Sequence, residues 1–178
     1  MLAKFRHYVN LNDLRSIYFA IFSSIMTYGS IIFGQSLNVP IRRIEKIQNK
    51  AIRILNFASF KSETGPLYKK SKIIRFSDHV KLQNFFLVHD DINKRNPFAL
   101  QNTFKLAKNM HKYSTRGAVN SKVILPGIRK QTYGKFSISY QAAIIWNIMV
   151  SKFKNDSLHL KNKVFCKNLI TNYLFNSY

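Results

Sequence analysis

An amphipathic pattern over residues 40–57 constrains the fold more than any other feature of the sequence. Isoleucine, leucine and alanine recur in this segment at the 3.6-residue period of an α-helix, which makes one broad face apolar. Pro40 stands at the start, where the first helical turn tolerates a residue without an amide hydrogen. The pattern therefore predicts a helix over 40–57. Its apolar face consists of Ile41, Ile44, Ile47, Ala51, Ile52, Ile54 and Leu55.

Cations occupy the opposite face of the same helix. They fall within about 100° of arc at the angular spacing of an α-helix. The one acid of the segment, Glu45, flanks them and does not lie among them. Exposed helix faces usually mix charges of both signs, so we favour a surface that follows phosphate groups over an ordinary solvated basic face. We call this set the basic stripe; its members are Arg42, Arg43, Lys46, Lys50 and Arg53.

The rest of the chain shares this positive charge. It has 29 Lys and Arg against 7 Asp and Glu, a formal net charge of +22 in 178 residues, and every third of the sequence has a basic excess. Such a charge opposes folding through self-repulsion, which a polyanion would relieve. Nucleic acid is the polyanion that we favour, because Lys and Arg release counterions from its phosphates. An anionic membrane surface is the alternative.

The stretch from Ser16 to Ile41 has no charged residue and raises the question of a membrane span. About 20 apolar residues are enough to cross a bilayer. This stretch, however, contains several serines, a threonine and two glycines. We therefore expect a buried core helix here, which begins after Asn12 as N-cap with Asp13 in its first turn, and we favour it over membrane insertion of 16–41.

The remaining pattern predicts a mainly α fold, a helical bundle with one small β-hairpin near residues 122–140 and two C-terminal helices. The hairpin would join Val123–Leu125 to a strand at 136–140, where apolar and polar residues alternate. Helices are expected at about 78–95, at 141–153 and from Asp156 or Ser157 toward Phe175. We divide the chain into a helical domain, residues 1–100, and a C-terminal segment, residues 101–178.

The sequence contains no phosphate-binding glycine loop, no HExxH motif and no zinc-ligand spacing of histidine and cysteine. Val88-His89-Asp90-Asp91 resembles the metal-binding motif of reverse transcriptases. That chemistry requires a β-turn, whereas this string lies in a helical pattern, so we interpret the match as accidental. With seven acids in total, a two-metal site is hard to assemble. We expect no catalytic residue, no bound metal and no cofactor in this chain alone.

Several short motifs nevertheless occur in a familiar order. They are LAKFRHYVNLNDLRSIYFAIFSSIMTYG (2–29), IRRIEKIQNKAIRIL (41–55), Thr64 with Pro66 and Leu67, HKYSTR (111–116), and Tyr133–Tyr140 followed by Trp146-Asn147. Together they cover nearly the whole chain and resemble the region downstream of the palm in jockey-like non-LTR (LINE-type) retrotransposon reverse transcriptases. They depart from that family at Phe33, where tryptophan is usual, and at Ala142, where glycine is usual.

The resemblance implies a fragment of an RNA-directed DNA polymerase. The chain would be a thumb and post-palm segment that grips an RNA template or RNA–DNA hybrid through its backbone. The fingers, the palm and the catalytic aspartates with their Mg²⁺ would belong to the parent polymerase, and the intact element would act in the nucleus. A second binding patch would consist of Lys112, Tyr113, Thr115 and Arg116, and Tyr113 and Tyr133 would stack on unpaired bases.

Two other functions remain open on the sequence. One is a membrane-associated basic protein with 16–41 inserted in the bilayer. The other is a small RNA-binding protein that is unrelated to polymerases.

Overall fold

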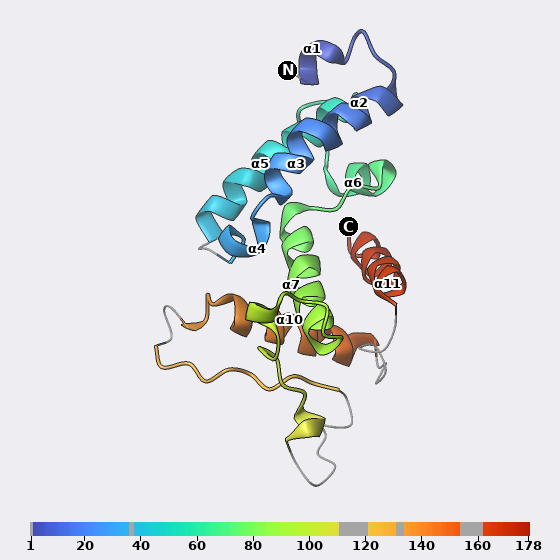
Figure 1. Cartoon of the computed structure of the whole chain (residues 1–178). Helices are drawn as coiled ribbons and strands as arrows, with labels where there is room; N and C mark the ends of the chain where they lie inside the picture. The colour runs from blue at the N-terminus through green and yellow to red at the C-terminus, as the bar shows by residue number, and fades with distance from the viewer. Residues whose placement is uncertain (1, 36–37, 111–120, 131–133, 154–161) are drawn as a thin grey trace. The chain divides into compact units, whose positions relative to one another are not determined.

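The computed structural model describes residues 2–35, 38–110, 121–130, 134–153 and 162–178 (Figure 1). The predicted mainly α fold is confirmed: helices account for most of these residues, and none of them belongs to a β-strand.

The chain forms two compact units. The first unit contains Met1–His79 and Thr171–Tyr178, and the second contains Val80–Ile170. The domain boundary that we predict at residue 100 separates a thumb-like domain from a C-terminal segment, and it stays a prediction.

The first unit begins with a chain of short helices. These are α1 (Leu2–Phe5), α2 (Leu11–Ile17), the π-helix η1 (Tyr18–Ser23), α3 (Ser24–Thr27) and α4 (Ser30–Phe33). The N-cap of α2 is Asn10 and not Asn12 as predicted, because the Asn10 side chain accepts a hydrogen bond of 2.9 Å from the backbone NH of Asp13. Gly29 has φ = +62°, a left-handed conformation that separates α3 from α4.

The uncharged stretch is therefore not one buried helix, and that expectation is wrong. Leu14 and Tyr18 are buried, but Ile21, Ile25 and Ile32 are exposed. Only one side of this segment packs into the core of the first unit, so its other side remains open. No helix within the described part of the chain is long and apolar enough to cross a membrane.

The predicted amphipathic helix is present as α5 (Asn38–Leu55). Ala51, Ile52 and Leu55 are buried, as the apolar pattern predicts, and they pack in one cluster with Leu14 and Tyr18. Tyr68 of α6 (Gly65–Ser71) and Ile73 complete this cluster. The cluster is the core of the first unit.

A buried amide lies in the middle of this apolar face. Gln48 is 1% exposed, and its Nε2 donates to the Tyr18 hydroxyl at 3.2 Å and to the Ile74 carbonyl at 3.0 Å. Its Oε1 accepts from the backbone NH of Phe76 at 2.8 Å. Gln48 thus joins α5 to η1 and to the start of α7 (Phe76–Ile92), with its own polar atoms satisfied.

Two further tyrosines hold the first unit together. The Tyr68 hydroxyl donates to Asn49 Oδ1 at 2.8 Å, and the Tyr178 hydroxyl donates to Asp78 Oδ2 at 2.9 Å. The Arg75 guanidinium lies 4.5 Å from the centroid of the Tyr178 ring and 5.4 Å from that of Tyr68. Burial raises the pKa of both hydroxyls well above the usual value for tyrosine, against the opposing effect of Arg75. Both therefore remain protonated donors at neutral pH.

The second unit is built around aromatic stacking. The ring of Phe85 in α7 stacks on Trp146 of α10 (Ile138–Phe153), with 4.8 Å between centroids. Trp146 Nε1 donates to the Ser121 carbonyl at 3.1 Å. Asn147 pairs with both backbone groups of Val123, at 2.8 Å and 2.9 Å. Two short 3₁₀ helices, η2 (Phe98–Leu100) and η3 (Ala107–Asn109), and α11 (Lys163–Asn176), which continues into the first unit, complete the described elements.

The predicted β-hairpin near residues 122–140 is not confirmed. Val123 forms only an isolated antiparallel bridge with Leu106, and Ile138–Tyr140 form the first turn of α10. The strand at 136–140 is therefore wrong. Its alternation covers only five residues, whereas the helical spacing from Ile138 continues to the buried Ala142 and Trp146 and decides the conformation. The predicted helix at 141–153 consequently starts three residues earlier, at Ile138.

Three helices end in a left-handed residue where glycine is usual. These residues are Phe57 after α5, Lys72 after α6 and Lys94 after α7, with φ of 53°, 52° and 55°. At the end of α6 the NH of Ile73 donates to the Tyr68 carbonyl at 3.1 Å, and the NH of Lys72 donates to Lys69 at 3.2 Å. This is the Schellman pattern. A side chain in this conformation costs about 1–2 kcal/mol.

We predict that Gln48→Ala lowers the free energy of unfolding by about 3 kcal/mol, because it leaves buried backbone and hydroxyl groups without partners. Ile47→Ala is the control, since Ile47 is the next residue along α5 and is 58% exposed. Urea unfolding followed by far-UV circular dichroism measures the difference. Equal midpoints for the two variants would contradict the assigned role of Gln48.

We also predict that Lys72→Gly raises the free energy of unfolding by about 1 kcal/mol, because glycine adopts the left-handed conformation without strain. Lys70→Gly removes the same charge from an exposed site inside α6 and should lower stability by a similar amount. The same urea titration compares the two. A destabilised Lys72→Gly variant would show that the lysine side chain makes a stabilising contact.

Candidate nucleic-acid interface

The basic stripe lies on the side of α5 that faces away from the core of the first unit. Arg42, Arg43, Lys46 and Lys50 are exposed. At the rise of an α-helix, the stripe from its first to its last member extends over about 16 Å. The burial of Gln48, Ala51 and the other core-facing residues fixes the rotation of the helix, so these cations point outward together.

The described carboxylates do not pair with the stripe. Among the described residues, none of its five members forms an ion pair with a carboxylate. The described ion pairs, His89–Asp90 and Lys163–Asp90, lie in the second unit. A row of exposed cations on one helix, none of them ion-paired among the described residues, is an electrostatic surface for phosphates.

Arg53 differs from the other members of the stripe. It is only partly exposed, its Nε donates to the Ser62 carbonyl at 2.9 Å, and its guanidinium lies 5.9 Å from the centroid of the Phe60 ring. Ile47, which the pattern places on the apolar face, is 58% exposed and borders the stripe. The stripe thus consists of four exposed cations followed by one arginine whose orientation is fixed by a hydrogen bond.

The second predicted patch lies outside the described residues. This applies to Lys112, Tyr113, Thr115 and Arg116, and also to Tyr133. Their role in binding stays a prediction.

Two exposed aromatic residues that the sequence reading did not select follow the stripe. Phe57 is 49% exposed and Phe60 is 78% exposed, and both come directly after α5. The Arg6 guanidinium lies 4.6 Å from the centroid of the Phe57 ring. The sequence did contain a signal for their exposure. Both phenylalanines follow a basic helix, and they belong to no periodic apolar pattern that would place them in a core.

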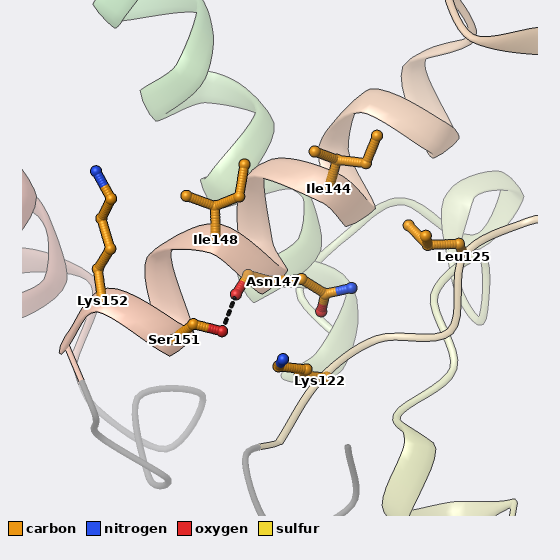
Figure 2. A pocket seen from close by; sticks show the side chains of 7 residues that line it. All are labelled: Lys122, Leu125, Ile144, Asn147, Ile148, Ser151 and Lys152. Carbon is orange, nitrogen blue, oxygen red and sulfur yellow. Dashed lines mark hydrogen bonds between the residues drawn. The ribbon is translucent and has the colours of Figure 1, made fainter. Parts of the chain in front are cut away.

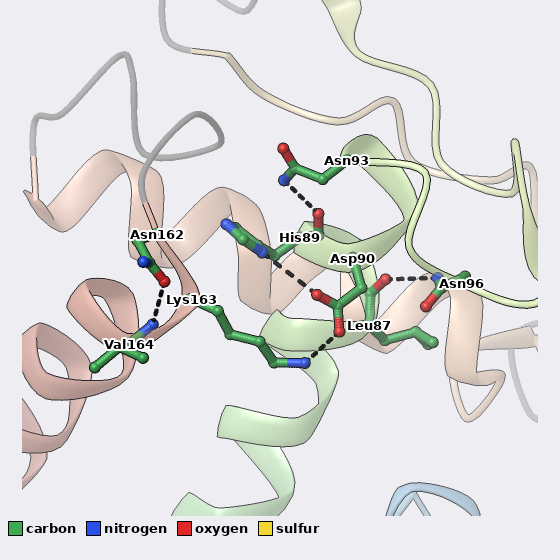
Figure 3. A network of polar contacts seen from close by, with 8 residues as sticks. All are labelled: Leu87, His89, Asp90, Asn93, Asn96, Asn162, Lys163 and Val164. Carbon is green, nitrogen blue, oxygen red and sulfur yellow. Dashed lines mark hydrogen bonds and ion pairs between the residues drawn. The ribbon is translucent and has the colours of Figure 1, made fainter.

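The adjacent carboxylates of the second unit have structural partners. Asp90 pairs with Lys163, and its Oδ1 lies 3.6 Å from His89 Nδ1 (Figure 3). Asp91 Oδ2 accepts from the backbone NH of Phe104 at 2.8 Å. Both acids lie on α7, as the helical pattern predicted. Within the described residues no three histidine, cysteine, aspartate or glutamate side chains are grouped to hold a metal ion.

A shallow groove of about 380 Å³ lies beside α10 in the second unit (Figure 2). Its polar groups are largely engaged within the protein: Asn147 holds both backbone groups of Val123, and the Ser151 hydroxyl donates to the Asn147 carbonyl at 2.8 Å. What remains for a ligand is mainly apolar surface. The groove is lined by Lys122, Leu125, Ile144, Asn147, Ile148, Ser151 and Lys152.

Comparison of the chain with protein-family models, with curated proteins and with solved structures found no match.

Proposed function

We propose that the chain binds the sugar–phosphate backbone of an RNA template or RNA–DNA hybrid through the basic stripe, as the thumb-like part of a retrotransposon reverse transcriptase. The observation that carries the proposal is the row of exposed cations on α5, which has no carboxylate partner among the described residues. The order of motifs that resembles the LINE-type family supports the assignment to a polymerase.

The anchoring of α5 supports binding by a preorganised surface. Gln48 and Asn49 are both hydrogen-bonded to other elements of the first unit, so the backbone that carries the stripe is held in place. Only the side chains then lose freedom when phosphates bind, which reduces the entropic cost of association.

Backbone contacts of this kind do not read sequence. Phosphate contacts position a nucleic acid, whereas base edges specify it. In an A-form duplex the major groove is too deep and narrow for side chains to read. The proposed activity is therefore non-specific binding of the duplex with strong salt dependence.

We assign a binding role to this chain and place the polymerase chemistry in the fingers and palm of the parent enzyme. Three of the described acids already have structural partners: Asp78 accepts from Tyr178, Asp90 pairs with Lys163, and Asp91 accepts from Phe104. The fingers and palm are the protein partner in this proposal, and Mg²⁺ would be bound by them.

We predict that replacing Arg42, Arg43, Lys46 and Lys50 with Gln weakens binding to every RNA–DNA hybrid alike. Each lost phosphate contact should reduce the slope of log affinity against log salt by about 0.7–0.9. Fluorescence anisotropy with a labelled hybrid over a salt series measures both quantities. The matched control replaces four other exposed lysines, Lys69, Lys70, Lys105 and Lys108, and leaves the same net charge.

The control decides between a surface and a bulk effect. If the stripe variant and the lysine control lose the same affinity and show the same reduction in salt-dependence slope, the total charge of the protein governs binding and the stripe does not. A small RNA-binding protein unrelated to polymerases would pass this test too. A coding remnant of a polymerase palm beside this sequence in genomic DNA would distinguish the two.

A second candidate function is attachment to an anionic membrane surface, which the exposed apolar side of the first unit favours. Ile25 is 71% exposed, Tyr28 84% and Ile32 68%. Nearby hydroxyls already donate within the chain, Ser24 to Ala20 at 2.5 Å and Thr27 to Ser23 at 2.9 Å, which lowers the cost of removing them from water. Apolar side chains beside excess positive charge suit the boundary of an anionic bilayer.

If this second function operates, Ile25→Asp with Ile32→Asp should reduce flotation with phosphatidylserine vesicles by roughly tenfold or more, because both variants place a charge on a side chain that would enter the bilayer. Phe98→Asp is the control, since Phe98 is 91% exposed and lies in the second unit. Equal flotation of wild type and the double variant would exclude insertion of this surface.

A further inference from the structure

Two pairs of arginine and phenylalanine lie at the C-terminal end of α5. Arg6 lies over Phe57 and Arg53 over Phe60, and both rings are substantially exposed. We propose that this end of α5 is a stacking site for unpaired bases, which holds a single strand where it leaves the duplex on the basic stripe. The inference rests on the proposed function and adds the substrate class: a duplex with a single-stranded extension.

The backbone at Phe57 is the first step of the argument. The NH of Phe57 donates to the Ile54 carbonyl at 3.2 Å, and the NH of Ala58 donates to the Arg53 carbonyl at 3.0 Å. This is the Schellman pattern in which glycine is the usual left-handed residue, yet Phe57 occupies it with φ = 53°. A bulky residue in this conformation is strained, and strain of this kind concentrates at functional sites. Packing accounts for it only in part, because Phe57 is 49% exposed.

Arg53 and Phe60 are oriented in a similar way. The bond from Arg53 Nε to the Ser62 carbonyl fixes the guanidinium plane, and the NH of Ser62 donates to the Ser59 carbonyl at 3.0 Å to close a turn around Phe60. Phe60 nevertheless remains 78% exposed. An oriented arginine beside an open ring is suited to stack on bases, since both groups present flat faces.

The position of the pairs limits what they can bind. Arg53 is the last member of the stripe, so a strand that follows the stripe reaches this site at its end. Paired bases hide their faces in the stack, whereas unpaired bases expose them to aromatic rings. The site therefore discriminates for a single-stranded extension and not for a base sequence.

The test compares two probes with one set of variants. One probe is a blunt RNA–DNA hybrid, and the other is the same hybrid with a single-stranded RNA extension that carries 2-aminopurine, whose fluorescence falls on stacking. Wild type should bind the extended probe more tightly and quench it. Phe57→Gly and Phe60→Ala should each reduce this preference by about fivefold or more and restore the fluorescence, with blunt-hybrid binding unchanged.

Stability and unrelated aromatic residues are controlled separately. Phe57→Gly relieves the left-handed strain and loses the contact of the ring with Arg6, and because these effects oppose each other its urea midpoint should stay near that of wild type. Lost binding would then not reflect unfolding. Phe98→Ala removes a ring that is 91% exposed in the second unit and should leave both probes unaffected.

Each contrary outcome has a distinct meaning. No preference of wild type for the extended probe, or an equal loss on both probes in the phenylalanine variants, would overturn the stacking site. Unchanged blunt-hybrid binding in the stripe variant would instead overturn the proposed function. Loss of binding to anionic vesicles in Phe60→Ala, with the extension preference retained, would assign the rings to a lipid surface and overturn the inference.

Discussion

The amide of Gln48 connects three parts of the first unit that are distant in the sequence. It is hydrogen-bonded to Tyr18, to the carbonyl of Ile74 and to the NH of Phe76, and it is almost completely buried. An apolar side chain here would fill the space but leave backbone groups unpaired in the core. Because these bonds fix how α5 is rotated, they also determine which of its side chains face solvent. The orientation of the basic stripe thus depends on one neutral residue on the opposite face.

This arrangement separates the source of stability from the source of charge. Most hydrogen bonds in the core of the first unit join neutral groups, and the bond from Tyr178 to the Asp78 carboxylate is the charged case. Burial raises the pKa of Tyr18, Tyr68 and Tyr178 and keeps their hydroxyls protonated. Apart from Arg53, the cations of α5 lie on the outside and are not held by ion pairs among the described residues. Their mutual repulsion therefore lowers the stability of the folded protein, and a bound polyanion would reduce this repulsion.

Sequence reasoning succeeded where a long period decided the conformation. The helix around α5 and the helical placement of Asp90 follow from such periods, and both are confirmed. The strand that we predict at 136–140 is wrong, because its alternation covers only five residues. The helical spacing from Ile138 to the buried Trp146 is longer and determines the conformation. The helical period did not predict the burial of Gln48 or the left-handed conformation of Phe57. Gln48 is a polar residue within an apolar face, and Phe57 occupies a helix-end position where glycine is the usual residue.

The two ends of α5 are electrostatically different, and this bears on the order of duplex and single strand. A helix N-terminus favours phosphate, whereas the C-terminus carries a partial negative charge that disfavours it. Arg42 and Arg43 lie near the favourable end, while the Arg6–Phe57 and Arg53–Phe60 pairs lie at the unfavourable one. Neutral base faces do not meet that repulsion, and arginine next to the last carbonyls offsets part of it. The helix dipole and the side chains therefore favour the same orientation of the nucleic acid along α5. Phosphates lie along the first turns of the helix, and unpaired bases lie at its C-terminal end.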